Sequence, residues 1–371
     1  MYDVPPNRRH GERQDSRRRE ITNPSEATSA TDDGSGQGGE LGTFDRRRRS
    51  TVPRARAASP EPAAGGGQSA AGGGKPAAGG DDAGVERLET ALFAGCITPA
   101  PVARTVGRGR VAIFTAARPA STSVNEDGAA VIHCGPSDAV LVVADGMGGH
   151  PAGEQASRVA LETFVRRLRV AREENAALDD AVILDTIAEA NRRIQETCAG
   201  SGTTIAVAHI HVDQVRFHHC GDSPGLLLGS QGDVKLRTVD HSPVGEAVEK
   251  GILTPEQGIR HADRHVISNY VGYPGTFVDS SPFVPLAPGD TVVLATDGLS
   301  DNLLDDEIAA LAVHDAIDQA VCNLVAIAGA RMENRVARIE SGMPDPDPNA
   351  LPGKPDDLTV VAYRHPGNSG E

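Results

Sequence analysis

The apolar residues of this 371-residue chain are distributed very unevenly, and that distribution decides which part of the chain can fold. Residues 1–85 contain only six residues of the Leu, Ile, Val and Phe types, separated by glycine clusters and arginine runs. Ordering a residue's backbone costs about 1–2 kcal/mol, which so few apolar side chains cannot offset by burial. We therefore predict a disordered low-complexity tail over 1–95 and a single globular domain over 103–366.

The net charge of −15 lies entirely in the second part of the chain. Residues 1–95 carry 14 basic and 14 acidic side chains, whereas the remaining residues carry 22 and 37. Such an excess of negative charge repels a nucleic-acid backbone. No apolar run approaches the ~18 residues of a membrane-spanning helix. The N-terminus lacks the apolar segment of a signal peptide, and the five cysteines form no CxxC pair. These features predict a soluble, cytoplasmic protein that does not bind nucleic acid.

The pattern of apolar residues predicts which segments are strands and which are helices. Runs rich in Val and Ile predict strands over 111–114, 129–133, 139–144, 204–211, 214–219, 225–228, 234–238, 291–296 and 358–363. Apolar residues at helical spacing predict helices around 85–93, 156–168, 184–194 and 317–328. Because strands and helices do not alternate, antiparallel sheets with helices on the outside are favoured over a doubly wound parallel sheet.

Four aspartates lie where predicted strands begin or end. Asp145 and Asp297 follow strands and each precedes a glycine, whereas Asp127 and Asp356 precede strands. A lone Asp-Gly pair is most often a tight turn, but this set has no Lys or Arg at neighbouring strand ends to neutralise it. Oxygen ligands suit a hard cation such as Mg²⁺ or Mn²⁺. Glycine after Asp145 also lets the Gly146 carbonyl approach such an ion. We interpret the set as a metal site.

The motifs around these aspartates resemble those of the bacterial metal-dependent serine/threonine phosphatases of the PP2C (PPM) family. The first is Val142-Val143-Ala144-Asp145-Gly146-Met147-Gly148-Gly149-His150. The others, in the family's order, are Asn125-Glu126-Asp127, Gly202-Thr203-Thr204, Gly221-Asp222-Ser223, Gly289-Asp290, Thr296-Asp297-Gly298-Leu299-Ser300-Asp301 and Asp356-Asp357-Leu358-Thr359. The matches extend over about residues 105–365, which is the whole predicted domain.

The resemblance implies a fold and an activity. The fold is of the α+β class, a four-layer αββα sandwich in which two central antiparallel β-sheets are flanked by helix pairs. The activity is hydrolysis of phosphoserine and phosphothreonine in proteins by water that two Mg²⁺ or Mn²⁺ ions activate. The implied partners are phosphorylated substrates of a cytosolic kinase, and we expect a monomer.

The resemblance also assigns roles to residues of this chain. The implied metal ligands are Glu126, Asp127, Asp145, Gly146 through its carbonyl, Asp222, Asp297 and Asp356. Asp145 would bridge both ions and is the central catalytic residue, while Asp222 and Asp297 match a weaker third metal position. Residues 240–275 correspond to a mobile flap beside the site.

The chain departs from the family pattern where the substrate phosphate is bound. The arginine that often lies about five residues before the strand-start aspartate is replaced by Thr122, so Arg118 is the candidate phosphate-binding residue. Pro224 also stands where the family often has arginine. The sequence does not decide which group acts as the general acid. His150 is one candidate, because its pKa range suits protonation of a leaving group. Alternatively, His150 caps a helix, or metal-bound water acts as the acid.

These departures motivate a second hypothesis, a catalytically weak regulatory module that binds phosphoproteins or a kinase. A purely structural Ca²⁺ site is a third, which is disfavoured because the acids form no twelve-residue calcium loop. Four histidines, His209, His211, His218 and His219, invite a separate metal interpretation. The alternation of His209 and His211 with Val207 instead predicts residues on the polar face of a strand.

Overall fold

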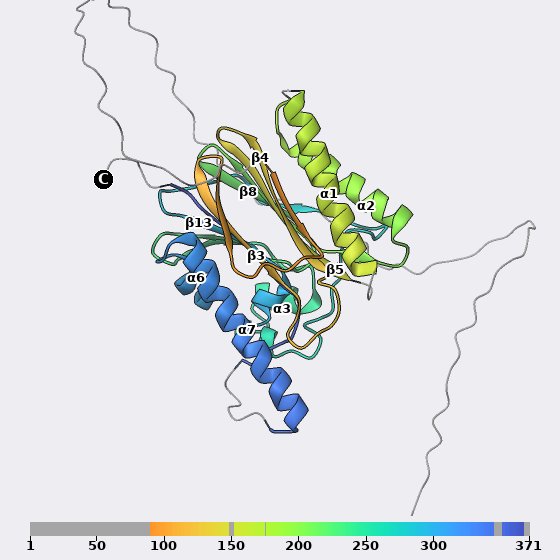
Figure 1. Cartoon of the computed structure of the whole chain (residues 1–371), viewed down its shortest axis with the longest axis vertical. Coiled ribbons are helices and arrows are strands. Elements are labelled where there is room, and N and C mark those ends of the chain that lie inside the picture. The colour runs from red at the N-terminus through yellow and green to blue at the C-terminus, as the bar shows by residue number, and fades with distance from the viewer. Residues whose placement is uncertain (1–89, 148–151, 175, 345–350, 367–371) are drawn as a thin grey trace, which may run out of the picture. The chain divides into compact units, whose positions relative to one another are not determined.

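The computed structural model describes residues 90–147, 152–174, 176–344 and 351–366, all within a unit that spans Ala78–Glu371. Two antiparallel sheets lie face to face, with α1 (Ala152–Glu173) and α2 (Asp180–Thr197) covering one outer face. Helices α6 (Asp305–Ala312) and α7 (Ile317–Ser341) cover the opposite outer face (Figure 1). This arrangement confirms the predicted four-layer αββα sandwich.

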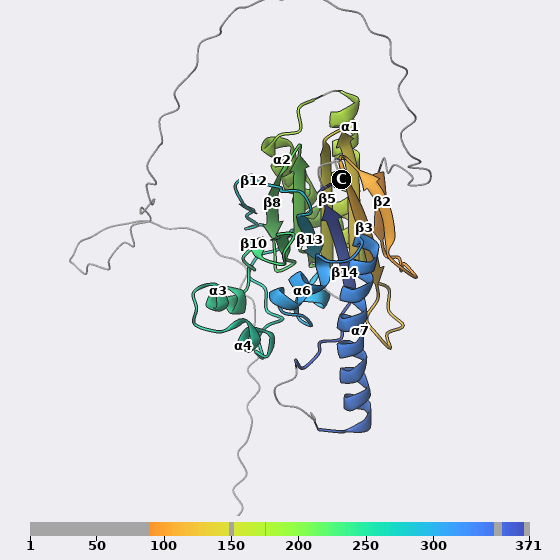
Figure 2. The same ribbon diagram turned by 90° about the vertical axis from the view of Figure 1, so that its left-hand side faces the viewer.

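Each sheet has a simple antiparallel order. The first sheet runs β1 (Thr90–Ala94), β4 (Asp127–Gly135), β5 (Asp138–Met147), β7 (Ile205–His211), β8 (Gln214–Cys220) and β11 (Asp279–Ser280), with β6 (Gly202–Thr203) paired to β5 and β12 (Val284–Pro285) to β8. The second sheet runs β10 (Val234–Arg237), β9 (Gly225–Leu228), β13 (Thr291–Ala295), β14 (Leu358–Arg364), β3 (Gly109–Ala116) and β2 (Val102–Val106). The short helices α3 (Pro243–Glu249) and α4 (Pro255–Ile259) lie at one end of the sandwich (Figure 2). A third short helix, α5 (Asp297–Ser300), follows β13.

Three apolar cores hold the four layers together. The first lies between the α1–α2 pair and the first sheet, the second between the two sheets, and the third between the second sheet and α6 and α7. The central strands are therefore buried on both faces. A strand with two buried faces has no polar side to alternate with, which explains the uninterrupted apolar run 139–144.

The start of the domain differs from the prediction. Residues Thr90–Ala94 form strand β1, which pairs with β4 from Thr90 opposite Ile132 to Ala94 opposite Gly128. The expected helix over 85–93 is thus wrong for its described part, and a boundary at residue 95 removes a strand of the first sheet. A run of five residues is too short for periodicity to separate helix from strand. The predicted disorder of 1–89 lies outside the described residues.

The topology brings the strand-end aspartates to one edge of the sandwich. Asp127 begins β4, Asp297 begins α5 directly after β13, and Asp356 precedes β14, the neighbour of β13. Asp145 does not end its strand as expected, because β5 continues to Met147 by pairing with β6. Among the described helices, none is long and apolar enough to cross a membrane.

Candidate active site

Two carboxylates face each other across the centre of the site. Asp127 and Asp145 are directly opposed on the neighbouring strands β4 and β5. Like charges in such a pair normally destabilise a sheet. Asp127 is only 1% exposed, and its Oδ2 accepts a hydrogen bond from Thr296 Oγ1 at 2.6 Å. Burial raises the pKa of Asp127 well above its ordinary value, and nearby carboxylates, first that of Asp357, raise it further.

The backbone of Asp145 is held by the Gly-Thr-Thr and Gly-Asp-Ser motifs. Thr203 Oγ1 and Thr204 N donate to the Asp145 carbonyl at 2.8 and 2.9 Å, and Asp145 N donates to Thr204 Oγ1 at 3.1 Å. Ser223 in turn is hydrogen-bonded to Thr204 through their hydroxyl oxygens, 2.7 Å apart. These two motifs therefore position the aspartate. Burial, and then the charge of Asp127, raise the pKa of the Asp145 carboxyl well above its ordinary value.

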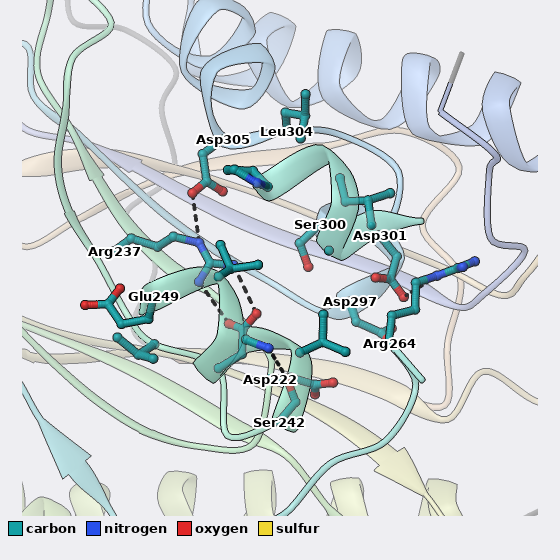
Figure 3. A pocket seen from close by; sticks show the side chains of 18 of the residues that line it. Asp222, Arg237, Ser242, Glu249, Arg264, Asp297, Ser300, Asp301, Leu304 and Asp305 are labelled. Atoms are coloured by element: carbon teal, nitrogen blue, oxygen red, sulfur yellow. Dashed lines mark hydrogen bonds and ion pairs between the residues drawn. The ribbon is translucent and has the colours of Figure 1, made fainter. Parts of the chain in front are cut away.

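Further acids reach the same place from three other loops. Asp297 and Asp301 are four residues apart on the turn after β13, so they share one face. Asp222 follows β8 and lines a pocket with both of them (Figure 3). Burial, followed by the charge of Asp297, raises the pKa of Asp301 to about 7 and that of Asp356 to about 6. Asp301 belongs to a recognised motif, but sequence reasoning did not include it among the site residues.

No Lys or Arg was expected at the strand ends to pair with these acids, but a lysine from the loop before β14 does pair with them. Lys354, two residues before Asp356, places its ammonium against Asp297, at 2.7 Å from Asp301 Oδ2 and at 3.0 Å from Asp356 Oδ2. Burial alone would lower the pKa of this lysine, but the three carboxylates raise it, so it is charged. Arg264 adds a weaker contact, with Nε 3.7 Å from Asp301. Lys354 lies four residues before β14, so it is not among the residues at the strand ends.

The loop before β4 is tied to the site by Asp357. Its Oδ1 accepts from Arg118 N at 2.8 Å and its Oδ2 accepts from Glu126 N at 2.7 Å. A carboxylate offers two equivalent acceptor oxygens, whereas asparagine offers one, which accounts for aspartate here. The backbone of Arg118 thus lies beside the acids, while its side chain and that of Thr122 are exposed. His150 lies outside the described residues.

Gly146 packs closely against the first turn of α1. A Cβ at this position would lie 2.1 Å from the carbonyl oxygen of Gly153, so a larger residue would displace the helix. The Glu126 carbonyl accepts hydrogen bonds from Gly146 N at 3.2 Å and from Ser157 Oγ at 2.6 Å. Helix α1 therefore fixes both residues that flank the Asp127–Asp145 pair in sequence. This packing alone accounts for the glycine.

A pocket opens from the acids toward the predicted flap. Its walls come from α3 and α4, and Asp222, Asp297, Asp301 and Arg264 form its inner side (Figure 3). Arg237 on another wall is neutralised by Asp240 at 3.0 Å and by Asp305 at 2.9 Å. The segment 240–275 therefore does lie beside the acids, as the resemblance implied. Pro224, the other departure from the family pattern, is buried and its carbonyl accepts from Ala295 N at 3.1 Å.

Comparison with known proteins agrees with this geometry. A sequence model described as protein phosphatase 2C matches residues 117–333. Serine/threonine phosphatase stp of Listeria innocua serovar 6a is 34% identical over 196 residues, covering 50% of this chain and 75% of stp. The PPM Ser-Thr phosphatase MsPP of Mycobacterium smegmatis, solved with cacodylate, has a TM-score of 0.54 at 25% identity over 68% of this chain and 97% of MsPP. The PstP catalytic domain, solved with two manganese ions, has a TM-score of 0.52 at 24% identity over 69% and 97%.

The fold and the clustered acids define a phosphoprotein phosphatase of the αββα sandwich type. More than half of the chain matches the family, and the curated relative is covered over three quarters of its length. The chain therefore belongs to the protein phosphatase 2C family and is a serine/threonine protein phosphatase.

Proposed function

We propose that this phosphatase hydrolyses phosphoserine and phosphothreonine in proteins with the help of Mg²⁺ or Mn²⁺ bound at the clustered acids. The proposed ligands are Glu126, Asp127, Asp145, the Gly146 carbonyl, Asp222, Asp297 and Asp356. The observation that carries the proposal is the direct opposition of Asp127 and Asp145, joined by acids from three distant loops. Without a bound cation, so many neighbouring carboxylates would repel one another and destabilise the folded protein.

The donor set fits a hard divalent cation. Among the described residues, six carboxylates are set against the ammonium of Lys354 and the more distant guanidinium of Arg264, so negative charge is in excess there. These carboxylates belong to Asp127, Asp145, Asp222, Asp297, Asp301 and Asp356. In the part of the chain that the structure describes, Asp297 Oδ1 is buried without a hydrogen-bond partner. Oxygen donors without thiolate or imidazole favour Mg²⁺ and Mn²⁺. When bound, two such ions lower the pKa of water and offset the charge of a phosphate.

The protein's own residues then perform three tasks. Thr203, Thr204 and Ser223 hold Asp145 in place. The Asp357 carboxylate anchors the loop that carries Arg118, whose guanidinium we assign to the phosphate oxygens as a bidentate donor. The pocket under α3 and α4 admits the phosphorylated segment of the substrate.

Replacing one carboxylate of the opposed pair tests this assignment. With Mn²⁺, the full chain should hydrolyse p-nitrophenyl phosphate and phosphopeptides and should stop when chelator is added. Asp145→Asn should reduce kcat by roughly 1000-fold or more, equivalent to about 4 kcal/mol of transition-state stabilisation. Its Tm in chelator should equal or exceed that of the wild type, because one repelling charge is gone. Its Mn²⁺-induced rise in Tm should shrink.

The control is Asp185→Asn, which removes an exposed carboxylate on α2. This variant should keep full activity and the full Mn²⁺ response. Wild-type protein that shows no metal-dependent turnover on phosphopeptides would overturn the proposal and favour the regulatory-module hypothesis. Full activity in Asp145→Asn would show that the opposed pair is not the metal site.

A further inference from the structure

A second group of metal-ligating side chains lies at the opposite end of the first sheet. Asp138 is the first residue of β5, and it pairs with His211 at the end of β7. His209 is two residues earlier on β7 and therefore points to the same face of the sheet. One ligand atom from each of the three residues lies within 4.8 Å of the others. Asp138 and Asp145 are seven residues apart on β5, so this group lies roughly 23 Å from the acidic site.

The inner member of this group lacks the partners that a buried histidine requires. His209 is 1% exposed, and neither of its ring nitrogens has a hydrogen-bond partner among the described residues. Burial lowers the pKa of His209 to about 4, so the ring is neutral and can donate a lone pair to a metal. Leaving a buried polar group without a partner destabilises the folded protein. The prediction that His209 lies on a polar face is therefore wrong, since the helix-facing side of β7 is buried at this position.

The outer members are open to solvent. His211 is hydrogen-bonded through Nδ1 to Asp138 Oδ1, and the side chains of the two residues are 52% and 26% exposed. An ion can thus reach the group from solvent through Asp138 and His211, and His209 lies at the buried end of the group. Arg216, opposite His209 on β8, is ion-paired with Asp180 at the start of α2, so its charge is compensated.

We propose that Asp138, His209 and His211 bind a divalent transition-metal ion of the Zn²⁺ class. Two imidazoles and one carboxylate are a common Zn²⁺ donor set, which leaves a fourth position for water. Bonds of about 2.0–2.1 Å place tetrahedral ligand atoms about 3.3 Å apart. The exposed His211 side chain, at the end of its strand, supplies the movement that this requires. The site is independent of the phosphatase chemistry.

A second cluster of similar composition does not meet the same requirement. His219, His241 and Asp279 also bring ligand atoms within 4.8 Å. However, Nδ1 of His241 accepts hydrogen bonds from Gly221 N at 3.2 Å and from Asn269 Nδ2 at 2.7 Å. The proton of the neutral ring must then lie on Nε2, which faces Asp279 at 3.2 Å. This ring has no free lone pair to offer in that direction, so the cluster is an ordinary hydrogen-bonded group.

Co²⁺ and Zn²⁺ titrations of the full chain in saturating Mg²⁺ test the proposal. Mg²⁺ fills the oxygen-rich site and does not favour imidazole. Wild-type protein should bind one Co²⁺ with the visible d–d bands of tetrahedral coordination, without a thiolate charge-transfer band, and Zn²⁺ should displace it. His211→Ala should weaken Zn²⁺ binding by at least roughly 100-fold and leave phosphatase activity unchanged. Asp138→Asn, which keeps the side-chain shape, should also weaken binding.

The matched control is His314→Ala, which removes an exposed histidine before α7. This variant should bind Zn²⁺ like the wild type. Equal Zn²⁺ affinity in wild type and His211→Ala would overturn the proposal. So would ion binding that is lost in Asp145→Asn but kept in His211→Ala, because it would place the ion at the acidic site. Absence of tetrahedral Co²⁺ bands in the wild type would overturn it as well.

Discussion

Lys354 is the residue whose contacts most affect the behaviour of the acidic site. Its ammonium neutralises part of the charge of Asp297, Asp301 and Asp356. A divalent cation at these carboxylates must share them with the lysine or displace it. We therefore expect Lys354 to stabilise the metal-free protein and to compete with the metal ion proposed for this site.

Replacement of this lysine by methionine should separate the two effects. Lys354→Met should lower Tm in chelator, because removing one partner leaves buried carboxylates unpaired. It should also enlarge the rise in Tm that Mn²⁺ produces, since the ion no longer competes with an ammonium. Thermal unfolding with and without Mn²⁺ measures both changes. Lys250→Met, which removes an exposed lysine directly after α3 that does not line the pocket, should change neither. A Mn²⁺ response identical to that of the wild type would contradict the competition.

Arg118 is the second residue whose role can be tested directly. Arg118→Ala should raise KM for p-nitrophenyl phosphate by about 10- to 100-fold with little change in kcat, because a charged hydrogen bond contributes about 1.5–3 kcal/mol. Arg118→Lys should restore only part of this loss, since lysine cannot form the bidentate contact. Arg169→Ala, on the exposed side of α1, is the control. Unchanged kinetics in Arg118→Ala would remove it from the phosphate site.

Residues of the site differed in how visible they were in the sequence. Asp127, Asp145, Asp297 and Asp356 were visible because each adjoins a run of apolar strand residues within a family motif. Lys354, Asp301 and Asp357 were not assigned roles, because their importance depends on contacts across the fold. The Lys354–Asp301 pair joins residues 53 positions apart, and no local pattern reports such a contact.

At the level of elements, strand β1 is the first described element of the folded domain. Deletion of 1–89 should leave Tm unchanged, whereas deletion of 1–95 should lower it. The longer deletion removes Phe93, which packs against the core between the sheets, and exposes the edge of β4. Burial of such a side chain contributes about 1.5–3 kcal/mol, and each kcal/mol corresponds to about 2–4 °C in a domain of this size. Calorimetry of the two deletions checks the difference; equal Tm values would contradict the role of β1.

The sequence predicted the long elements well and the short ones poorly. Helices α1, α2 and α7 were found because each shows several turns of apolar periodicity. The central strands were found because burial on both faces makes them continuously apolar. β1, β6, β11 and α3 to α5 are short, so their conformation depends on what they pack against. The flap helices α3 and α4 do carry readable signals, since Ser242 and Thr254 cap them and proline follows each cap.

At the scale of the whole molecule, the buried histidines and the acidic site should change stability in opposite directions as the pH falls. His218 is fully buried, and burial lowers its pKa to about 4; Asp180 opposes this shift, whereas Arg216, His209 and His219 add to it. Below pH 6.5 this histidine is therefore protonated in the unfolded chain, whereas it stays neutral in the folded chain down to about pH 4. The stability lost between pH 6.5 and pH 4 is on the order of 3 kcal/mol for such a group. The carboxyl groups of the acidic site change stability in the opposite direction. Because their pKa values are raised in the folded state, their protonation stabilises the fold as pH falls.

A comparison of pH slopes isolates the histidine from the carboxylates. Measured in chelator, the change in Tm from pH 7 to pH 4 should be more favourable in His218→Gln than in the wild type, because the variant lacks the buried histidine that resists protonation. His314→Gln, at an exposed position, should leave the slope unchanged. Equal slopes in His218→Gln and wild type would contradict the burial effect at this residue.

The opposed aspartates also make the proposed metal site depend on a distant turn. Residues 136 and 137 join β4 to β5 at the far end of the hairpin, roughly 26 Å along the strand from Asp127. A register error of one residue would send Asp127 or Asp145 to the wrong side of the sheet. Insertions in this turn, although remote from any substrate, are therefore expected to be as damaging to turnover as substitutions among the acids themselves.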